Sequence, residues 1–305
     1  MNMTQQADSD VENYNHIRTG GACFVELPRG LIAVWGKEAI PFLDGMITND
    51  MKTLEDGQQM LAAFPNAQGR LLAVVRVLRQ GDQFYFETEE ATREKLFENL
   101  FRFTYAGDFF VQDYSTMNTY FEIFGQTALP DSPKSLMFSS PSTSGVFVPS
   151  AEAERFRSDM IGNDLIEIGD DLFETLRIES GVPKYGIDMD ENTIVPELSL
   201  DGMISYTKGC YVGQEIIARI HFRGHVAKKF TGLLSEPGGA AIGVLPGSEL
   251  TTPDGKNAGR ITSVTYSPKL ERTIALAFVR YDFLAPGNTL HAGEAVCTVG
   301  ELPFL

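Results

Sequence analysis

Residues 59–78, which read QMLAAFPNAQGRLLAVVRVL, decide the fold of the first half of the chain. Two apolar runs lie on either side of the four residues Asn-Ala-Gln-Gly, and Asn and Gly are residues that tight turns favour. We therefore predict two strands joined by this turn. A third strand, QFYFET (83–88), follows after a Gly-Asp pair.

Helical patterns lie on both sides of these strands. KEAIPFLDGMI (37–47) predicts a helix after the strand LIAVWG (31–36). The stretch 89–103 predicts a second helix, because its leucines and phenylalanines recur four residues apart. A strand at 108–114 follows, and the resulting order, β-α-β-β-β-α-β, is that of a ferredoxin-like unit.

The rest of the chain shows two different sequence patterns. Residues 120–180 partly repeat the α+β theme, with helical patterns at 151–161 and 170–180. The Pro- and Ser-rich stretch 128–145 predicts an exposed loop. From Phe230 onward, short apolar runs alternate with Gly and Pro turns, which predicts a small all-β barrel or sandwich.

The 305-residue chain is acidic, with 25 Lys and Arg against 41 Asp and Glu and a net charge of −16. A field of this sign repels nucleic acid and anionic membranes, so we expect neither as a partner. The polar stretch Met1–Val11 predicts a disordered tail rather than a signal peptide. No apolar run approaches the roughly 18 residues of a membrane span, so we expect a cytoplasmic protein.

The three cysteines are Cys23, Cys210 and Cys297. An odd number of widely spaced cysteines is not a disulfide framework and fits a reducing compartment. Three isolated thiols cannot supply the usual four ligands of an iron–sulfur cluster. We therefore expect no permanently bound cluster or metal.

Residues 208–215, KGCYVGQE, gather a cation, a thiol, a phenol, an amide, a carboxylate and two glycines in eight positions. They begin a basic segment, 208–229, whose net charge is +4 in a chain of net −16. Such a segment suits an anionic ligand, although a solvated basic face is the plain alternative. Gly209 and Gly213 allow the backbone to approach a ligand closely.

Cys210 lies two residues from Lys208, which gives its thiol a reason to titrate below its ordinary value of about 8.5. Thiolate character brings nucleophilicity, metal affinity and oxidation together, and the residues alone do not choose among them. A lone cysteine is otherwise a small buried hydrophobe, and this is our expectation for Cys23 and Cys297, which lie in apolar runs.

Three weaker patterns have plain alternatives. His221 and His225 are four apart, as metal ligands on a helix are, but Gly224 intervenes and no third ligand is near. Glu179 falls near a helix C-terminus, which disfavours an acid, so we expect a specific donor partner; an exposed helical glutamate is the plain alternative. The stretch 188–193 lacks the Gly and the distal Glu of a calcium loop and is interpreted as a solvated acidic turn.

KGCYVGQE with Arg219 downstream resembles the signature of the YgfZ family, the folate-binding branch of the glycine-cleavage T-protein (aminomethyltransferase) superfamily. FLDGMITNDM (42–51), NAQGRLL (66–72) and LRIESGVPKYG (176–186) resemble the family's other landmarks in the same order. The resemblance covers roughly residues 25–300.

The resemblance implies an α+β fold, a three-lobed aminomethyltransferase-like ring of two ferredoxin-like α+β lobes and a C-terminal β-barrel. The first lobe would be discontinuous and comprise residues 20–45 and 117–225. Residues 46–116 would form the second lobe and residues 226–305 the barrel. In this arrangement one strand near 25–36 pairs with the segments after about 117.

The resemblance also implies a function. The protein would bind tetrahydrofolate and serve the assembly or repair of iron–sulfur enzymes, [4Fe–4S] ones especially, with folate and iron–sulfur assembly proteins or client enzymes as partners. Cys210 would be the functional thiol, and Lys208 would tune it or meet the ligand. Glu179 would bind the pterin ring, and Arg219 or Arg223 the glutamyl tail. The expected folate-binding residues are Glu179, Tyr211, Gly213, Gln214, Glu215, Arg219 and Arg223.

One departure separates this chain from the aminomethyltransferases. Those enzymes place a catalytic aspartate in the strand after the NAQG-like turn, whereas the strand here, 70–80, has no acid. A reaction that needs a carboxylate at that place loses its group. A folate-dependent aminomethyltransferase or demethylase is therefore the alternative function rather than the first one.

Overall fold

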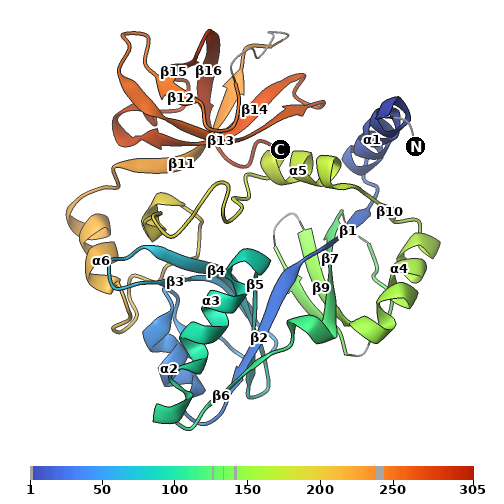
Figure 1. Ribbon diagram of the computed structural model, residues 1–305, viewed down its shortest axis with the longest axis vertical. Coiled ribbons are helices and arrows are strands. Elements are labelled where there is room, and N and C mark those ends of the chain that lie inside the picture. The colour runs from blue at the N-terminus through green and yellow to red at the C-terminus, as the bar shows by residue number, and fades with distance from the viewer. Residues whose placement is uncertain (1–2, 126, 133, 141–142, 238–243) are drawn as a thin grey trace. The chain divides into compact units, whose positions relative to one another are not determined.

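The computed structural model describes residues 3–125, 127–132, 134–140, 143–237 and 244–305 (Figure 1). The chain divides into two compact units. The first unit comprises Met1–Pro65, Leu72–Leu172 and Gly202–Val212, and the second comprises Asn66–Leu71, Phe173–Asp201 and Gly213–Leu305. The boundary between Val212 and Gly213 divides the signature at 208–215 between the two units.

The first unit contains a five-stranded sheet in the order β3-β4-β5-β2-β6. Its strands are β2 (Arg29–Trp35), β3 (Gln59–Pro65), β4 (Leu71–Gln80), β5 (Gln83–Glu89) and β6 (Phe110–Asp113). Helix α2 (Ala39–Met46) follows β2, and helix α3 (Glu90–Phe101) follows β5. The predicted order β-α-β-β-β-α-β is thereby confirmed, together with the turn that joins β3 to β4.

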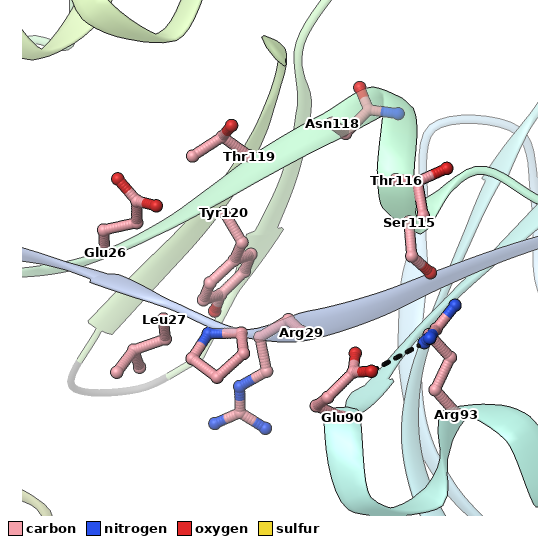
Figure 2. Close-up of a pocket in the computed structure, with 11 residues that line it drawn as sticks. Glu26, Leu27, Arg29, Glu90, Arg93, Ser115, Thr116, Asn118, Thr119 and Tyr120 are labelled. Atoms are coloured by element: carbon pink, nitrogen blue, oxygen red, sulfur yellow. Dashed lines mark hydrogen bonds and ion pairs between the residues drawn. The ribbon is translucent and has the colours of Figure 1, made fainter.

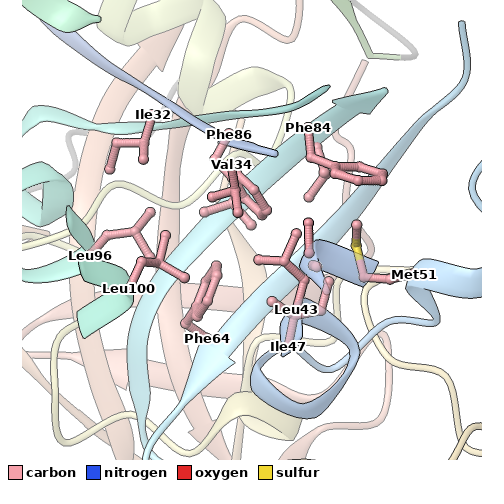
Figure 3. Close-up of a cluster of buried hydrophobic side chains, with 14 of the residues drawn as sticks. Ile32, Val34, Leu43, Ile47, Met51, Phe64, Phe84, Phe86, Leu96 and Leu100 are labelled. Carbon is pink, nitrogen blue, oxygen red and sulfur yellow. The ribbon is translucent and has the colours of Figure 1, made fainter. Parts of the chain in front are cut away.

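The two helices bury their apolar sides in the core of this sheet. Leu96 and Leu100, one turn apart on α3, are fully buried, as the spacing predicted. Figure 3 shows them beside Phe64 of β3, with Leu43 of α2 in the same cluster. Burying a side chain of this size contributes about 1.5–3 kcal/mol, so this cluster is what fixes α2 and α3 on the sheet.

A second five-stranded sheet of the first unit has the order β10-β1-β7-β9-β8. Its strands are β1 (Cys23–Leu27), β7 (Asn118–Phe124), β8 (Leu136–Ser139), β9 (Thr143–Pro149) and β10 (Ile166–Glu167). Helix α4 (Ala153–Gly162) buries Phe156 and Met160 against this sheet. The helical pattern at 151–161 is confirmed.

Two expectations about this unit were wrong. The single strand near 25–36 is two strands: β1 pairs with β7, whereas β2 pairs with β5 and β6 of the other sheet. Pro28 lies between them, and a proline cannot continue a sheet ladder. The stretch 128–145 was expected to be an exposed loop, but it includes β8, whose Phe138 is fully buried.

The N-terminal expectation was also wrong. Residues 3–11, predicted to be a disordered tail, belong to helix α1 (Met3–Arg18), and residues 1–2 lie outside the described residues. Tyr14 of this helix is 2 % exposed, and the Arg18 guanidinium lies 5.3 Å from its ring centroid. Burial of one aromatic ring holds a helix that its polar composition does not predict.

The second unit contains a closed six-stranded barrel in the order β11-β14-β13-β12-β15-β16 (orange to red in Figure 1). Its strands are β11 (Lys228–Ser235), β12 (Glu249–Thr251), β13 (Asn257–Ser267), β14 (Arg272–Arg280), β15 (Thr289–Ala292) and β16 (Ala295–Gly300). Helix α6 (Gln214–Arg223) precedes the barrel, and helix α5 (Asp170–Glu179) begins in the first unit and ends in the second.

Two α+β sheets and a C-terminal β-barrel confirm the predicted fold class. The ring arrangement of the lobes and the exact domain boundaries stay predictions. No helix among the described residues is long and apolar enough to span a bilayer.

Candidate functional site

The first half of the signature is anchored by Lys208. Its side chain is fully buried, and its Nζ donates to the backbone oxygens of Asp44 (2.6 Å), Ile47 (3.0 Å) and Asn49 (2.6 Å). The Oδ1 of Asp44 lies 3.1 Å from the same nitrogen. These carbonyls belong to the last turn of α2 and the residues after it, where a helix leaves its acceptors unpaired and favours a cation.

Backbone hydrogen bonds join the same two segments. Thr48 Oγ1 donates to the Met203 oxygen at 2.7 Å, and the Ser205 N–H donates to the Thr48 oxygen at 2.9 Å. Asn49 Nδ2 donates to the oxygens of Leu61 and Gly202. Residues 42–51 therefore hold residues 202–212 by hydrogen bonds, and both segments belong to the first unit.

The charges of Asp44, Lys52 and Lys208 affect one another. Burial acts to raise the pKa of Asp44, but hydrogen bonds from Lys52 and Lys208 outweigh it and hold that pKa below its ordinary value. Burial lowers the pKa of the Lys208 ammonium, which its contact with Asp44 opposes. Lys208 needs this carboxylate, because without Asp44 its ammonium would be a buried charge without an acid partner.

Cys210 lies between two anchored residues. Lys208 is held as described, and the Val212 N–H donates to the Gly45 oxygen at 3.0 Å. Cys210 itself is exposed, whereas Cys23 and Cys297 are buried, as expected for both. Burial raises the pKa of Cys23 to about 12 and that of Cys297 to about 11. The chain thus presents one accessible thiol on a fixed backbone.

The geometry gives Lys208 a positioning role. An ammonium has three N–H donors, and four oxygens of residues 44–49 lie within 3.1 Å of this one. The ring of Tyr211, whose centroid lies 5.1 Å from Nζ, covers the same charge. Burial raises the pKa of Tyr211 to about 12. The predicted effect of Lys208 on the Cys210 thiol stays a prediction.

The second half of the signature begins helix α6 in the second unit. Gly213 adopts φ +79°, and a Cβ there would lie 2.4 Å from the Asn66 oxygen. Gly69 has φ +69°, and its Cβ would lie 3.2 Å from Ile216 of α6. Only glycine tolerates both the left-handed backbone and this approach. The NAQG turn and the start of α6 are therefore in direct contact.

Glu179, the last residue of α5, is fully buried. Its Oε1 accepts a hydrogen bond from the hydroxyl of Ser267, at the end of β13, and its backbone oxygen accepts one from the Phe304 N–H at 2.9 Å. The expectation that this glutamate needs a donor partner is confirmed. Because the carboxylate is covered, a ligand that reaches it must displace part of that cover.

A buried ion pair holds the segment after Glu179. Arg177 Nη1 lies 2.7 Å from Asp188 Oδ2, and its Nη2 donates to Ser263 Oγ at 2.9 Å. The ladder of β13 shifts register between Ile261 and Ser263, so Thr262 is an extra residue. A bulge re-aims side chains, and here the hydroxyls of Thr262 and Ser263 both donate to Asp188 Oδ1. The interpretation of 188–193 as a solvated turn was therefore wrong for Asp188.

Helix α6 carries the predicted cationic residues. Arg219 and Arg223 are exposed and lie one turn apart on it. His221 is on this helix, but His225 follows its end and stacks on Tyr281, with ring centroids 3.7 Å apart. In the part of the chain that the structure describes, no three His, Cys, Asp or Glu side chains form a metal-binding group.

A cavity of about 370 Å³ lies in the first unit, and Figure 2 shows residues that line it. Arg29 and Arg93 line it together with Tyr120, and Arg93 is held by Glu90 at 2.9 Å and Asp113 at 2.7 Å. None of the residues predicted for the site lines this cavity.

The predicted site residues therefore fall in two groups. Lys208, Cys210 and Tyr211 belong to the first unit; Glu179, Gly213, Gln214, Glu215, Arg219 and Arg223 belong to the second. Sequence reasoning missed Asp44 and Ser267. Asp44 lies in a landmark that we quoted, but no spacing signals a partner 164 residues away.

The fold is that of the glycine-cleavage T-protein. A solved aminomethyltransferase T of the glycine cleavage system from Bartonella henselae matches 97% of this chain and 89% of its own with a TM-score of 0.85 at 17% identity. Residues 228–304 match the family model of the glycine cleavage T-protein C-terminal barrel domain. The two sheets and the barrel therefore define an aminomethyltransferase-like fold.

Curated relatives narrow the class. The tRNA-modifying protein YgfZ of Escherichia coli O157:H7 is 28% identical over 264 residues, 79% of each chain. A mitochondrial iron–sulfur cluster assembly factor of Mycosarcoma maydis is 26% identical over 67% of this chain and 55% of its own. A putative chloroplastic transferase of Arabidopsis thaliana is 33% identical over 148 residues, and the match spans 48% of this chain but only 33% of that protein. The chain is thus similar to YgfZ proteins, as its signature predicted, and it shares the fold of the glycine-cleavage T-protein.

Proposed function

We propose that this protein is a cytoplasmic, tetrahydrofolate-binding accessory factor for the assembly or repair of iron–sulfur enzymes, [4Fe–4S] ones especially, and that it acts through the thiol of Cys210. Relatives named for iron–sulfur cluster assembly and for tRNA modification support the general role. The folate and the thiol are the finer parts of the proposal, and each rests on residues of this chain.

The single observation that carries the proposal is the exposure of Cys210 on an anchored backbone. Lys208 and the Val212 N–H fix the chain on both sides of the thiol. An exposed thiol is open to oxidation, so natural proteins seldom keep one without use. A soft thiolate is also a preferred ligand of iron–sulfur clusters, which makes a cluster or a cluster-bearing partner a suitable target.

The donor set of the second unit suits a folate. A pterin edge presents N–H donors, and the buried carboxylate of Glu179 is an acceptor for them. The glutamyl tail presents carboxylates, and the exposed guanidiniums of Arg219 and Arg223 are partners for those. A bound folate would supply a one-carbon carrier or a structural ligand, while these side chains would bind and orient it.

The alternative, a folate-dependent aminomethyltransferase or demethylase, lacks a group it needs. Strand β4 (Leu71–Gln80) follows the NAQG turn, and it contains no aspartate or glutamate. The chain shares its fold with aminomethyltransferase T, but a shared fold does not carry the chemistry of the site.

The test is restoration of a [4Fe–4S] enzyme's activity in cells that lack this protein. Wild type should restore the activity, and Cys210→Ala should not. Cys297→Ala is the matched control, because it removes a thiol that is buried in the barrel. If Cys210→Ala restores activity as well as wild type, the thiol has no role. Turnover of an N-methyl or aminomethylated substrate by the purified protein would favour the transferase instead.

A further inference from the structure

The cavity of the first unit lies where the chain passes from one sheet to the other. It is lined by the end of β1 and the start of β2, by the first turn of α3 and by residues 115–120, which lead into β7 (Figure 2). Strands β1 and β7 belong to one sheet and β2 to the other. Its volume of about 370 Å³ is at the low end of the range of about 300–1,000 Å³ for ligand sites, so a small ligand would suit it.

Gly30 of β2 makes room for one wall of this cavity. A Cβ at Gly30 would lie 2.9 Å from Cγ of Arg93, so the absence of a side chain lets the Arg93 stem pass over the strand. The Arg93 guanidinium then meets Glu90 at 2.9 Å and Asp113 at 2.7 Å. Arg93 is thus held on two sides and forms a fixed wall rather than an open cation.

Arg29 is a cation of this cavity with donors to spare. In the part of the chain that the structure describes, its side chain makes one ion pair, 3.3 Å from Nη1 to Glu87 Oε1, and no hydrogen bond, although a guanidinium has five N–H donors. Arg76 shares Glu87 and is buried to a similar degree, but it donates to Glu87, Phe138 and Tyr120. The donors of Arg29 are therefore available to a ligand in the cavity.

The two acids that line the cavity do not satisfy Arg29. Glu26 and Glu90 are each paired with another arginine. Arg29 lies opposite Glu89 in the β2–β5 ladder, and Glu89 is the residue before α3, whose N-terminal end carries a partial positive charge. The potential beside Arg29 therefore favours an anion.

Neutral polar side chains line another part of the cavity. Thr116 is exposed, and its hydroxyl makes no hydrogen bond among the described residues. The Asn118 amide donates to the Tyr114 oxygen at 2.9 Å, which leaves its own oxygen as an acceptor. The Thr119 hydroxyl donates to Ser150 across 3.3 Å. A ligand with hydroxyl groups would find both donors and acceptors here.

We propose that this cavity binds a small hydroxylated anion. Its carboxylate or phosphate group accepts hydrogen bonds from Arg29, because the planar fork of a guanidinium suits both oxyanions. Its hydroxyl groups bind Thr116 and Asn118. None of the residues expected to bind folate lines the cavity, so this proposal and the proposed function can fail independently.

The experiment compares two matched pairs of probes by calorimetry on the full chain: gluconate against glucose, and glycerol 3-phosphate against glycerol. We expect an anion to bind about tenfold more tightly than its neutral partner, as a charge-assisted hydrogen bond would provide. A preference for gluconate alone would assign a carboxylate ligand, and a preference for glycerol 3-phosphate alone a phosphate. If neither anion binds more tightly than its neutral partner, the inference is wrong.

A bulky side chain should close the cavity from its rim. Thr116→Phe should abolish the preference for the anion, and its exposed position makes unfolding an unlikely cause. Met117→Phe is the matched control, because it adds the same ring one residue further on, at a side chain that is exposed and does not line the cavity. Wild-type anion affinity in Thr116→Phe, or an equal loss in both variants, would overturn the inference.

Arg29→Lys tests the fork itself. Lysine keeps the charge beside Glu87 but not the planar pair of donors, so anion affinity should fall about threefold. Arg155→Lys is the control, because Arg155 is an exposed arginine of the same unit outside the cavity, and it should leave the affinity unchanged. Equal affinities in both variants would contradict the role of Arg29. If Arg29→Lys does not fold, Thr116→Phe decides.

Discussion

Lys208 and Asp44 form a buried ion pair, with 3.1 Å between Nζ and Oδ1, across 164 residues of the chain. The pair joins the first half of the signature to the end of helix α2. It therefore fixes the backbone that carries Cys210 by binding residues 208–212 to residues 44–49.

Replacement of Lys208 by methionine should destabilise the first unit. Methionine fills much of the same space, but it leaves three backbone oxygens without their donor and removes one of the two ammonium groups that pair with Asp44. Breaking a buried pair on one side costs about 3–5 kcal/mol. Urea unfolding should show a loss of this size. Lys52→Met is the control, because Lys52 bonds the same carboxylate from an exposed position and should have a much smaller, salt-dependent effect.

The acid stability of the protein should depend on Asp44. Its pKa is lower in the folded protein than in the unfolded chain, so the unfolded chain binds the extra proton and the stabilisation is lost as pH falls. The loss should begin near the unfolded value of about 3.9 and continue below it. In urea titrations from pH 7 to pH 3, wild type should approach Asp44→Asn in stability at the acid end. A difference that stays constant with pH would contradict this assignment.

The two glycines of the signature should respond differently to alanine. Gly213 has φ +79° and its Cβ would lie 2.4 Å from the Asn66 oxygen, so Gly213→Ala should cost about 2 kcal/mol or more. No atom lies within 4 Å of a Cβ on Gly209, so Gly209→Ala should stay within about 0.5 kcal/mol of wild type. Urea unfolding of both variants makes the comparison. Equal effects would mean that α6 does not begin on the NAQG turn as described.

Local pattern was enough to predict most of the fold, because hydrophobic period and turn residues act over a few positions. The β3–β4 turn, the face of α3 and the barrel all follow from such signals. The split between β1 and β2 had a signal too, Pro28, which the continuous apolar run around it obscured. Helix α1 had none, because its stability comes from tertiary burial of Tyr14.

The sequence was enough to name candidate residues of the site, but not to predict which atoms their side chains contact. Sequence spacing placed Lys208 beside Cys210, whereas the fold turns the ammonium toward backbone oxygens of residues 44–49. Every residue has a backbone carbonyl, so the sequence gives no sign of which carbonyls a lysine will bind. The anchoring role of Lys208 could therefore not be predicted. Glu179 was different, because an acid at a helix C-terminus needs a donor and Ser267 supplies one.

Alkylation should separate the three cysteines in the native protein. With iodoacetamide at pH 8, Cys210 should react first because its side chain is exposed. With pKa values of about 12 and 11, Cys23 and Cys297 would be ionised in only about one molecule in ten thousand and one in a thousand, and both are also covered. Mass spectrometry of peptides should therefore find one modified site, and all three after unfolding in urea.

The same measurement with tetrahydrofolate present tests whether the thiol and the ligand are linked. If folate binding orders the signature, Cys210 should react more slowly with folate than without it, while Cys23 and Cys297 stay unreactive. Lys208→Met separates anchoring from simple exposure, because loss of the anchor should change the Cys210 rate without exposing the other two thiols. Fast modification of Cys23 or Cys297 in the native protein would show that the sheet and the barrel do not protect them as the structure describes.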